Sequence, residues 1–181
     1  IGDWAFHGCD LIKNMRIPRS VRHIGKYAFG SCEHLEFIEV DQNNKHYTDI
    51  EGNLFTKDGR ILLQYAIGKK ETIHVVPSST KGIAFRAFSD AYALEHVDVR
   101  KVRNIEEKAF YWCVNLQTLT LDAACEIQGM QTFDHTHKLF KFIYRKVRRL
   151  LLVADIHGHL RLDYLKMTLK DKNISENDAL I

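Results

Sequence analysis

The chain has 181 residues, of which 26 are Lys or Arg, 23 are Asp or Glu and 10 are His, so its formal net charge is +3 at pH 7. With 45% hydrophobic and 27% charged residues, it has the composition of a folded globular protein, which excludes collagen-like and disordered chains. No apolar run approaches the length of about 18 residues that a membrane-spanning helix needs, and the small net charge does not predict nucleic-acid binding.

A short motif repeats along most of the chain. Its first copy reads Ile-Gly-Asp-Trp-Ala-Phe over residues 1–6, with later copies at 24–29, 83–88 and 105–110 and a degenerate, longer copy at 127–133. Copies that no other segment separates begin 22 or 23 residues apart. Mostly apolar residues follow each Phe at offsets of 3, 6, 9 and 11. Five copies in one register exclude chance spacing and predict a repeat protein.

Each repeat is predicted to form one coil of a solenoid. Its last apolar positions alternate with polar ones, as at 38–40, which is typical of a short strand with one buried face. The Ala-Phe segment before that strand suits a short helical turn. One coil cannot bury its own inner face, but stacked coils bury these residues in ladders. Cys9, Cys32 and Cys113 share one ladder position, so we expect free core thiols there.

The segment 41–75 interrupts the repeat. Two apolar runs, 54–56 and 61–63, flank Lys-Asp-Gly-Arg at 57–60. An Asp-Gly pair between apolar runs is typical of a β-hairpin. We therefore expect a hairpin insert that stays within the stack and pairs with the strands on either side.

The repeat, which reads Ile-Gly-x-x-Ala-Phe-x-x-Cys-x-x-Leu-x-x-Ile-x-Ile-Pro, resembles the BspA-type leucine-rich repeat over residues 1–40 and 76–144. The insert resembles the hairpin unit that interrupts such arrays. The resemblance implies a curved solenoid of about five coils over residues 1–144, and a binding role rather than catalysis. It identifies no partner, and a protein or a glycan ligand both remain open.

The unburied strand residues are expected to line one continuous face. Six of them are candidates for ligand binding: Arg16, Phe37, Glu39, His96, Asp98 and Thr120. An exposed aromatic ring beside charges, such as Phe37, can anchor a partner. The alternative is a solvated sheet face without a ligand, which is the commoner case for exposed strand residues.

The pattern changes after residue 144. A basic junction at 145–149 is expected to be solvated rather than to bind nucleic acid. The apolar run 150–154 then predicts a strand, 155–159 a loop and about 160–170 an amphipathic helix.

A second strand near 179–181, parallel to the first, would complete a strand-helix-strand unit. We therefore predict an α+β protein, in which a partial α/β unit at 150–181 follows the solenoid and the junction.

Asp155 and His157 lie two residues apart after this strand, so that both side chains can reach one divalent ion. Leu-Leu-Val-Ala-Asp-Ile-His-Gly-His-Leu resembles the first motif of the calcineurin-like metallophosphoesterases. That resemblance implies that Asp155 and His157 bind Mn, Fe or Zn in a two-metal centre that hydrolyses a phosphoester. The family's other ligand motifs are missing from 150–181, so we expect this chain by itself to be inactive.

Two functions therefore remain open. The chain is either an interaction module joined to the beginning of a metallophosphoesterase, or a binding or adhesion solenoid whose residues 150–181 form a terminal cap. In an isolated Asp-x-His, the Asp would cap a helix and the His would lie at the surface. No signal peptide is recognisable at Ile1, and free core thiols favour the cytoplasm over the cell surface.

Overall fold

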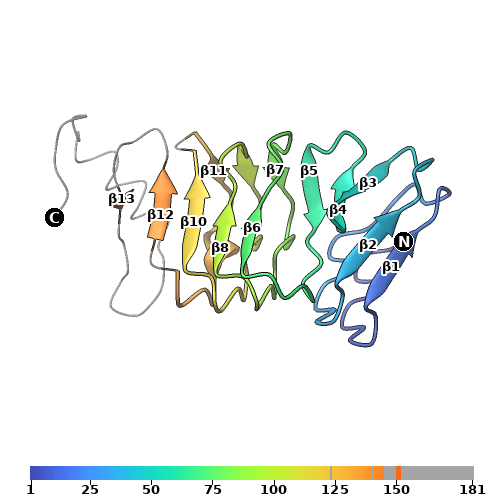
Figure 1. Cartoon of the computed structure of the whole chain (residues 1–181), viewed down its shortest axis with the longest axis horizontal. Helices are drawn as coiled ribbons and strands as arrows, with labels where there is room; N and C mark the ends of the chain where they lie inside the picture. The colour runs from blue at the N-terminus through green and yellow to red at the C-terminus, as the bar shows by residue number, and fades with distance from the viewer. Residues whose placement is uncertain (123, 140, 145–149, 152–181) are drawn as a thin grey trace.

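The computed structural model describes residues 1–122, 124–139, 141–144 and 150–151. These residues form an elongated β-solenoid whose strands lie side by side along the long axis (Figure 1). The strands are β1 (Asn14–Ile17), β2 (Phe37–Val40), β3 (Tyr47–Ile50), β4 (Asn53–Thr56), β5 (Ile61–Gln64), β6 (Ile73–Val75), β7 (Gly82–Ile83), β8 (His96–Asp98), β9 (Asn104–Ile105), β10 (Thr118–Leu121), β11 (Glu126–Ile127), β12 (Lys141–Tyr144) and β13 (Leu150–Leu151). The described residues add one 3₁₀ helix, η1 (Met130–Phe133).

The described strands form three sheets. Strands β1 and β2 pair in parallel as a two-stranded sheet, and a five-stranded sheet has the order β13-β12-β10-β8-β6. The third sheet has the order β11-β9-β7-β5-β4-β3. Strands of successive repeat coils pair in parallel, because each coil returns the chain to the same position one layer further along the axis.

Stacked aromatic rings form the inner ladder that the repeat predicts. The ring of Phe88 lies 4.9 Å from Phe110, and Phe110 lies 5.6 Å from Phe133, with the planes nearly parallel in both pairs. Phe6 and Phe29 stack in the same way at 5.6 Å in the first two coils. Phe29, Phe88 and Phe110 are at most 1% exposed, which confirms the predicted register.

The cysteines occupy their predicted column. Cys32 and Cys113 are each 1% exposed, and each thiol donates a hydrogen bond to the carbonyl of a Phe in the preceding coil. The acceptors are Phe6 for Cys32 and Phe88 for Cys113, both at 3.0 Å. Cys9 is only partly buried in the first coil, and all four cysteines are free thiols. Burial raises the pKa of the Cys32 thiol, which keeps it protonated.

The Ala-Phe segments form hydrogen-bonded turns and, in the last copy, the 3₁₀ helix η1 rather than an α-helix, and the described residues do not support the α+β class. The Phe N–H groups bond between coils, as Phe88 N donates to Ala109 O at 2.9 Å and Phe110 N to Thr132 O at 3.0 Å, whereas the preceding Ala N–H groups close local turns. Residues with positive φ flank each Phe and end the turn, as Arg86 and Asp90 do around Phe88. Because the Phe donors are used between layers, the turns do not extend into α-helices, and the described residues form a β-solenoid.

The hairpin insert forms as predicted. Strands β4 and β5 pair antiparallel, and Gly59 has a φ of 66° in the turn between them. The Asp58 carboxylate accepts hydrogen bonds from the Thr56 hydroxyl at 2.7 Å and from the Arg60 N–H at 3.1 Å, which closes this turn. The favourable local hydrogen bonds explain why an Asp-Gly pair marks the hairpin.

The last part of the insert adds a short coil that the repeat pattern did not predict. Strand β5 joins one sheet through β7, and β6 joins the other through β8, both in parallel. Tyr65 takes the place of the repeat's Phe in this coil, and its ring lies 5.1 Å from that of Phe88. The inner ladder of the C-terminal coils therefore begins inside the insert.

At the other end, β13 pairs antiparallel with β12, in the register Phe142↔Leu151 and Ile143↔Leu150. The predicted strand at 150–154 is thus described only over Leu150–Leu151, where it extends the solenoid's own sheet. Nothing described supports a separate strand-helix-strand unit. The loop, helix and second strand predicted for 155–181 lie outside the described residues.

We expect Phe110→Ala to lower the free energy of unfolding by about 3–5 kcal/mol, because it removes a fully buried ring that is stacked on both faces. Urea denaturation followed by circular dichroism measures this change. Phe37→Ala is the control, since that ring is 42% exposed and its loss should cost far less. A cost near zero for Phe110→Ala would refute the ladder.

Candidate functional site

The outward residues of the strands form two rows along the solenoid. The strand register aligns Asn14 with Phe37 and then Ile73, His96 and Thr118 in the first row. It aligns Arg16 with Glu39 and then Val75, Asp98 and Thr120 in the second row. We call these ten residues the strand face. All six candidates singled out from the sequence belong to it.

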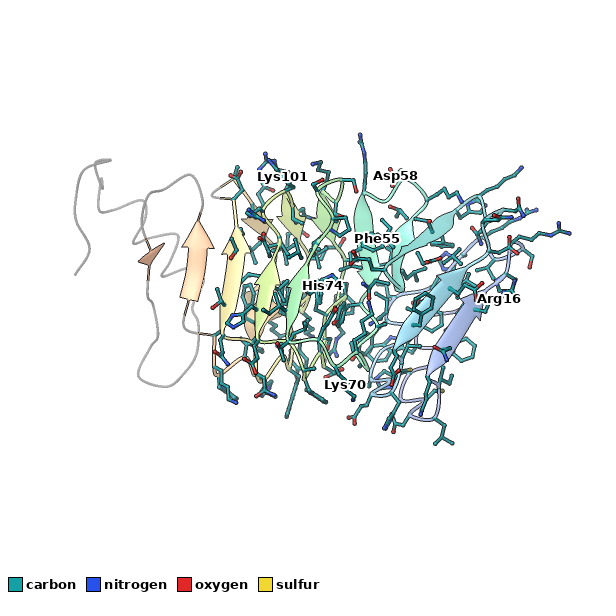
Figure 2. The ribbon with its side chains drawn as sticks, viewed as in Figure 1. Arg16, Phe55, Asp58, Lys70, His74 and Lys101 are labelled. Carbon is teal, nitrogen blue, oxygen red and sulfur yellow. The ribbon has the colours of Figure 1, made fainter. Side chains whose placement is uncertain are left out.

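The strand face is not one continuous sheet, as the sequence had suggested. Its first residues lie on β1 and β2, whereas the others lie on the five-stranded sheet that begins at β6. In Figure 2, Arg16 lies at one end of the molecule and His74 of β6 lies near the middle. The structure therefore brings Arg16, Phe37 and Glu39 together, and His96, Asp98 and Thr120 together, on two separate sheets.

A turn of the insert separates the two sheets. Gly52, at the tip of that turn, accepts a hydrogen bond from Ile38 N at 2.8 Å and so continues β2 in place of another coil. The Phe37 ring lies over Gly52 so closely that an added Cβ would come within 2.4 Å of it. A φ of 73° also favours glycine at this position. The insert thus covers part of the ring that the sequence suggested as an anchor.

The charged candidates are largely paired among themselves. Arg16 and Glu39 form an ion pair at 3.9 Å with both side chains more than half exposed, so that it contributes little to stability. Asp98 is more tightly held, since its carboxylate lies 2.6 Å from Arg100 Nε. His96 and Thr120 are partly buried.

Two large aliphatic residues of the strand face were missed in the sequence. Ile73 is 61% exposed and Val75 is 54% exposed, and both lie on β6 with their side chains on the same side of the sheet. The sequence signal was Ile-His-Val-Val-Pro at 73–77, which matches the end of a repeat except that His74 stands in the apolar column. That histidine concealed the register of β6.

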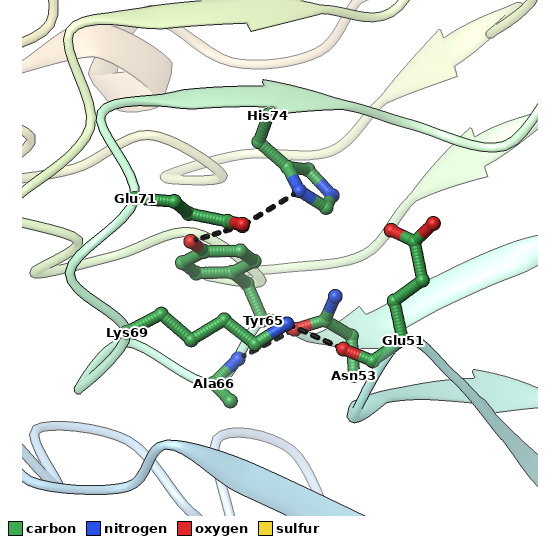
Figure 3. Close-up of polar contacts among 7 residues, drawn as sticks. All are labelled: Glu51, Asn53, Tyr65, Ala66, Lys69, Glu71 and His74. Carbon is green, nitrogen blue, oxygen red and sulfur yellow. Dashed lines mark hydrogen bonds and ion pairs between the residues drawn. The ribbon is translucent and has the colours of Figure 1, made fainter.

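His74 is buried directly beneath the strand face (Figure 3). Its side chain is 3% exposed, and Nδ1 lies 2.9 Å from Glu71 Oε1. The same carboxylate oxygen accepts a hydrogen bond from the Tyr65 hydroxyl at 2.8 Å. The other ring nitrogen, Nε2, has no hydrogen-bond partner among the described residues. Glu71, whose own side chain is partly exposed, thus contacts the polar atoms of two buried side chains, His74 and Tyr65.

The charge of this buried group follows from its surroundings. Burial lowers the pKa of His74, and the nearby Lys69 ammonium adds to this, while the carboxylates of Glu71 and Glu51 oppose it. Burial likewise raises the pKa of Tyr65, and its hydrogen bond to Glu71 adds to that effect. At neutral pH, His74 is therefore neutral, donates from Nδ1 to Glu71 and completes the core column of β6 as an uncharged side chain.

The predicted metal site lies outside the described residues. Asp155 and His157 are among 152–181, so their roles, and the Mn, Fe or Zn that they would bind, stay predictions from sequence. In the described ranges, no group of three or more His, Cys, Asp or Glu side chains is placed to hold a metal ion. Among the same residues, no helix has the length and apolar character that a bilayer span requires.

Parallel short strands, an inner Phe ladder and inter-coil thiol hydrogen bonds define a leucine-rich repeat solenoid. Comparison with family models matches residues 1–64 and 64–150 to the BspA type leucine rich repeat region (6 copies). The chain belongs to this family of leucine-rich repeat proteins. The match ends before Asp155, and nothing supports the metallophosphoesterase resemblance.

Two solved structures share the fold. The crystal structure of the pneumococcal vaccine antigen PcpA is 23% identical with a TM-score of 0.60, over 72% of this chain and 38% of that one. A leucine-rich repeat protein from Eubacterium ventriosum is 21% identical with a TM-score of 0.55, over 79% of this chain and 50% of that one. The chain thus spans at most half of either protein. No curated protein matches it in sequence.

We expect His74 to make the protein less stable in acid. Because burial lowers its pKa, the folded state binds the proton more weakly than the unfolded state, whose pKa is about 6.5. The part of the unfolding free energy that depends on a neutral His74 is fully present above that pH and is lost as the pH falls below it. Urea denaturation at pH 7.5 and pH 5.0 measures the loss, which His74→Leu should reduce.

His23→Leu is the control for this experiment, because His23 is exposed in a loop and the substitution should leave the acid sensitivity unchanged. An equal loss of stability in the wild type and in His74→Leu would show that other groups cause it.

Proposed function

We propose that this chain recognises a partner protein through its strand face, with Ile73 and Val75 as the centre of contact. The observation that supports this most directly is the exposure of both side chains, at 61% and 54%, on a regular parallel sheet. On the next two strands of the sheet, the outward positions carry polar residues, with His96 and Asp98 on β8 and Thr118 and Thr120 on β10. Two adjacent aliphatic side chains beside such polar strands are typical of the centre of an interface.

The energetics favour burial of this centre by a partner. Covering one Val or Ile side chain stabilises a complex by about 1.5–3 kcal/mol. Polar and charged residues border the pair, with His96 and Asp98 on the next strand of the sheet. An apolar centre with a polar rim is the usual arrangement at sites where proteins bind proteins.

A protein partner fits this surface better than a glycan. Sugars bind proteins through hydrogen bonds and through the faces of aromatic rings, whereas Ile73 and Val75 offer neither. Phe37 is the aromatic ring on the strand face, and Gly52 covers part of it. The charged pair beside the centre, Asp98–Arg100, is internally neutralised, as is Arg16–Glu39 on the other sheet, so these pairs would favour one orientation of the partner rather than attract a strongly charged ligand.

We expect the double substitution Ile73→Lys with Val75→Lys to weaken binding at least about tenfold, which corresponds to about 1.4 kcal/mol. Partners are selected from a displayed library of natural protein fragments against the immobilised chain, and each dissociation constant is measured by biolayer interferometry.

Leu11→Lys is the matched control, since Leu11 is a large aliphatic residue that is 97% exposed in a turn outside the strand face. Its substitution should leave the affinity unchanged. If the selected partners bind the Ile73/Val75 variant as tightly as the wild type, the strand face is not their binding site and the proposal fails.

The phosphoesterase function stays a separate prediction that rests on the Asp-x-His sequence alone. Its test is Mn²⁺ binding to the chain by calorimetry, compared with His157→Ala. Equal Mn²⁺ binding by both proteins would remove His157 from the predicted metal ligands.

A further inference from the structure

A basic hollow lies beside the ends of the first two parallel strands. It has a volume of about 540 Å³ and is lined by Arg19, Ser20, Arg22, Asn43, Lys45 and His46. The first three residues belong to the loop after β1, and the other three belong to the loop after β2. None of the six is acidic, and all six are exposed. We call this group of residues the basic hollow.

The two loops are held in place by one buried side chain. Asn44 is 1% exposed, and its amide nitrogen donates to the carbonyls of Pro18 at 2.9 Å and Val21 at 3.0 Å in the neighbouring loop. Its amide oxygen accepts from the backbone N–H groups of His46 at 2.8 Å and Tyr47 at 2.9 Å. All these hydrogen bonds are used to fix the backbone of the hollow, so its shape is formed before any ligand binds.

The cations of the basic hollow have no acidic partners. No ion pair within the described part of the chain includes Arg19, Arg22 or Lys45. The nearest carboxylates in sequence, Asp41 and Asp49, accept backbone N–H groups, from Asn43 at 2.9 Å and Val40 at 2.8 Å, and neither forms an ion pair with these cations. Within the described residues, these positive charges therefore have no ion-pair partner.

A later coil provides an internal comparison. Arg100 and Arg103 precede Ile105 by five and two residues, the same offsets at which Arg19 and Arg22 precede Ile24. Both arginines of the later coil are paired, Arg100 with Asp98 at 2.6 Å and Arg103 with Asp122 at 3.4 Å. The position equivalent to Asp98 in the first coil is Arg16, so the first coil has a cation where the later one has its counter-ion.

We propose that the basic hollow binds a small ligand with two or more sulfate or phosphate groups. Guanidinium groups bind tetrahedral oxyanions through two parallel N–H donors, and a lysine ammonium adds a third positive charge. The Ser20 hydroxyl and the Asn43 amide supply neutral donors between these cations. The site is distinct from the strand face and does not depend on the function proposed for that face.

The size of the hollow indicates a ligand larger than one inorganic ion. Pockets of about 300–1,000 Å³ are typical of sites for organic ligands of drug size, and 540 Å³ lies within that range. Because the cations come from both loops, one ligand that carries several oxyanions can neutralise both sides. Sulfated sugars and short polyphosphates share this chemistry.

The test uses the full chain of 181 residues and two probes, sodium tripolyphosphate and sucrose octasulfate, with isothermal titration calorimetry at pH 7 and 0.15 M NaCl. Arg19→Ser with Arg22→Ser should weaken binding by about tenfold or more, because each charge-assisted hydrogen bond is among the stronger contacts in proteins. Both side chains are exposed, and circular dichroism checks that the variant remains folded.

Arg100→Ser with Arg103→Ser is the matched control. It removes two positive charges from the equivalent loop positions, so the net charge changes by the same amount. It also exposes the carboxylates of Asp98 and Asp122, which weakens any unspecific attraction of anions at least as much. We expect this control to change the affinity less than about threefold, because it leaves the hollow intact.

The outcomes separate the possibilities. Loss of binding of either probe that is confined to the Arg19/Arg22 variant supports the basic hollow. Amide shifts confined to residues 19–22 and 43–46 during a nuclear magnetic resonance titration support it independently. Equal losses in both double variants, or no binding of either probe to the wild type, would overturn the proposal.

Discussion

The structure depends on the fact that no coil can complete its own backbone or core. The N–H of Phe88 bonds to Ala109 in the next coil, and that of Phe110 bonds to Thr132. The Phe rings between these bonds stack at 4.9 and 5.6 Å, so each layer buries the apolar face of its neighbour. Stability therefore comes from contacts between layers. The inward positions are strictly constrained, whereas the outward strand positions are free to differ from coil to coil.

The insert shows what happens when this rule is locally broken. It supplies Tyr65 to the inner ladder, but it places His74 in an apolar column. A buried imidazole requires a hydrogen-bond partner, and Glu71 provides it to both His74 and the Tyr65 hydroxyl. The arrangement leaves Nε2 unpaired, so this layer is less stable than one with a leucine would be. The insert also places the edge of the five-stranded sheet at β6, because β6 pairs with β8 but not with β2.

The sequence predicted the parts of the fold that repeat. Offsets from each Phe placed Cys32 and Cys113 in one buried column, and Asp58-Gly59 marked the hairpin. It did not predict that the Ala-Phe turns stop short of an α-helix, because turns whose Phe donors bond to another coil have the same local sequence as a helical turn. It did not predict that Ile73 and Val75 are exposed on a strand, because the polar His74 occupies the inward position where the repeat has an apolar residue. The basic hollow also escaped it, since Arg19 and Arg22 have the same spacing as Arg100 and Arg103, and only the folded chain reveals which pair lacks carboxylates.

The two proposed surfaces follow from the same freedom of outward positions, but they differ in chemistry. The centre of the strand face on β6 is aliphatic, and the neighbouring ion pair Asp98–Arg100 is internally neutralised, so its binding would depend weakly on salt. The basic hollow lies on loops beyond β1 and β2, and its attraction is electrostatic and would decrease with salt. Because Gly52 of the insert closes the edge of β2, the centre of the strand face on β6 and the basic hollow belong to different sheets. A substitution in one should therefore leave the other intact, as expected for sites that share no residues.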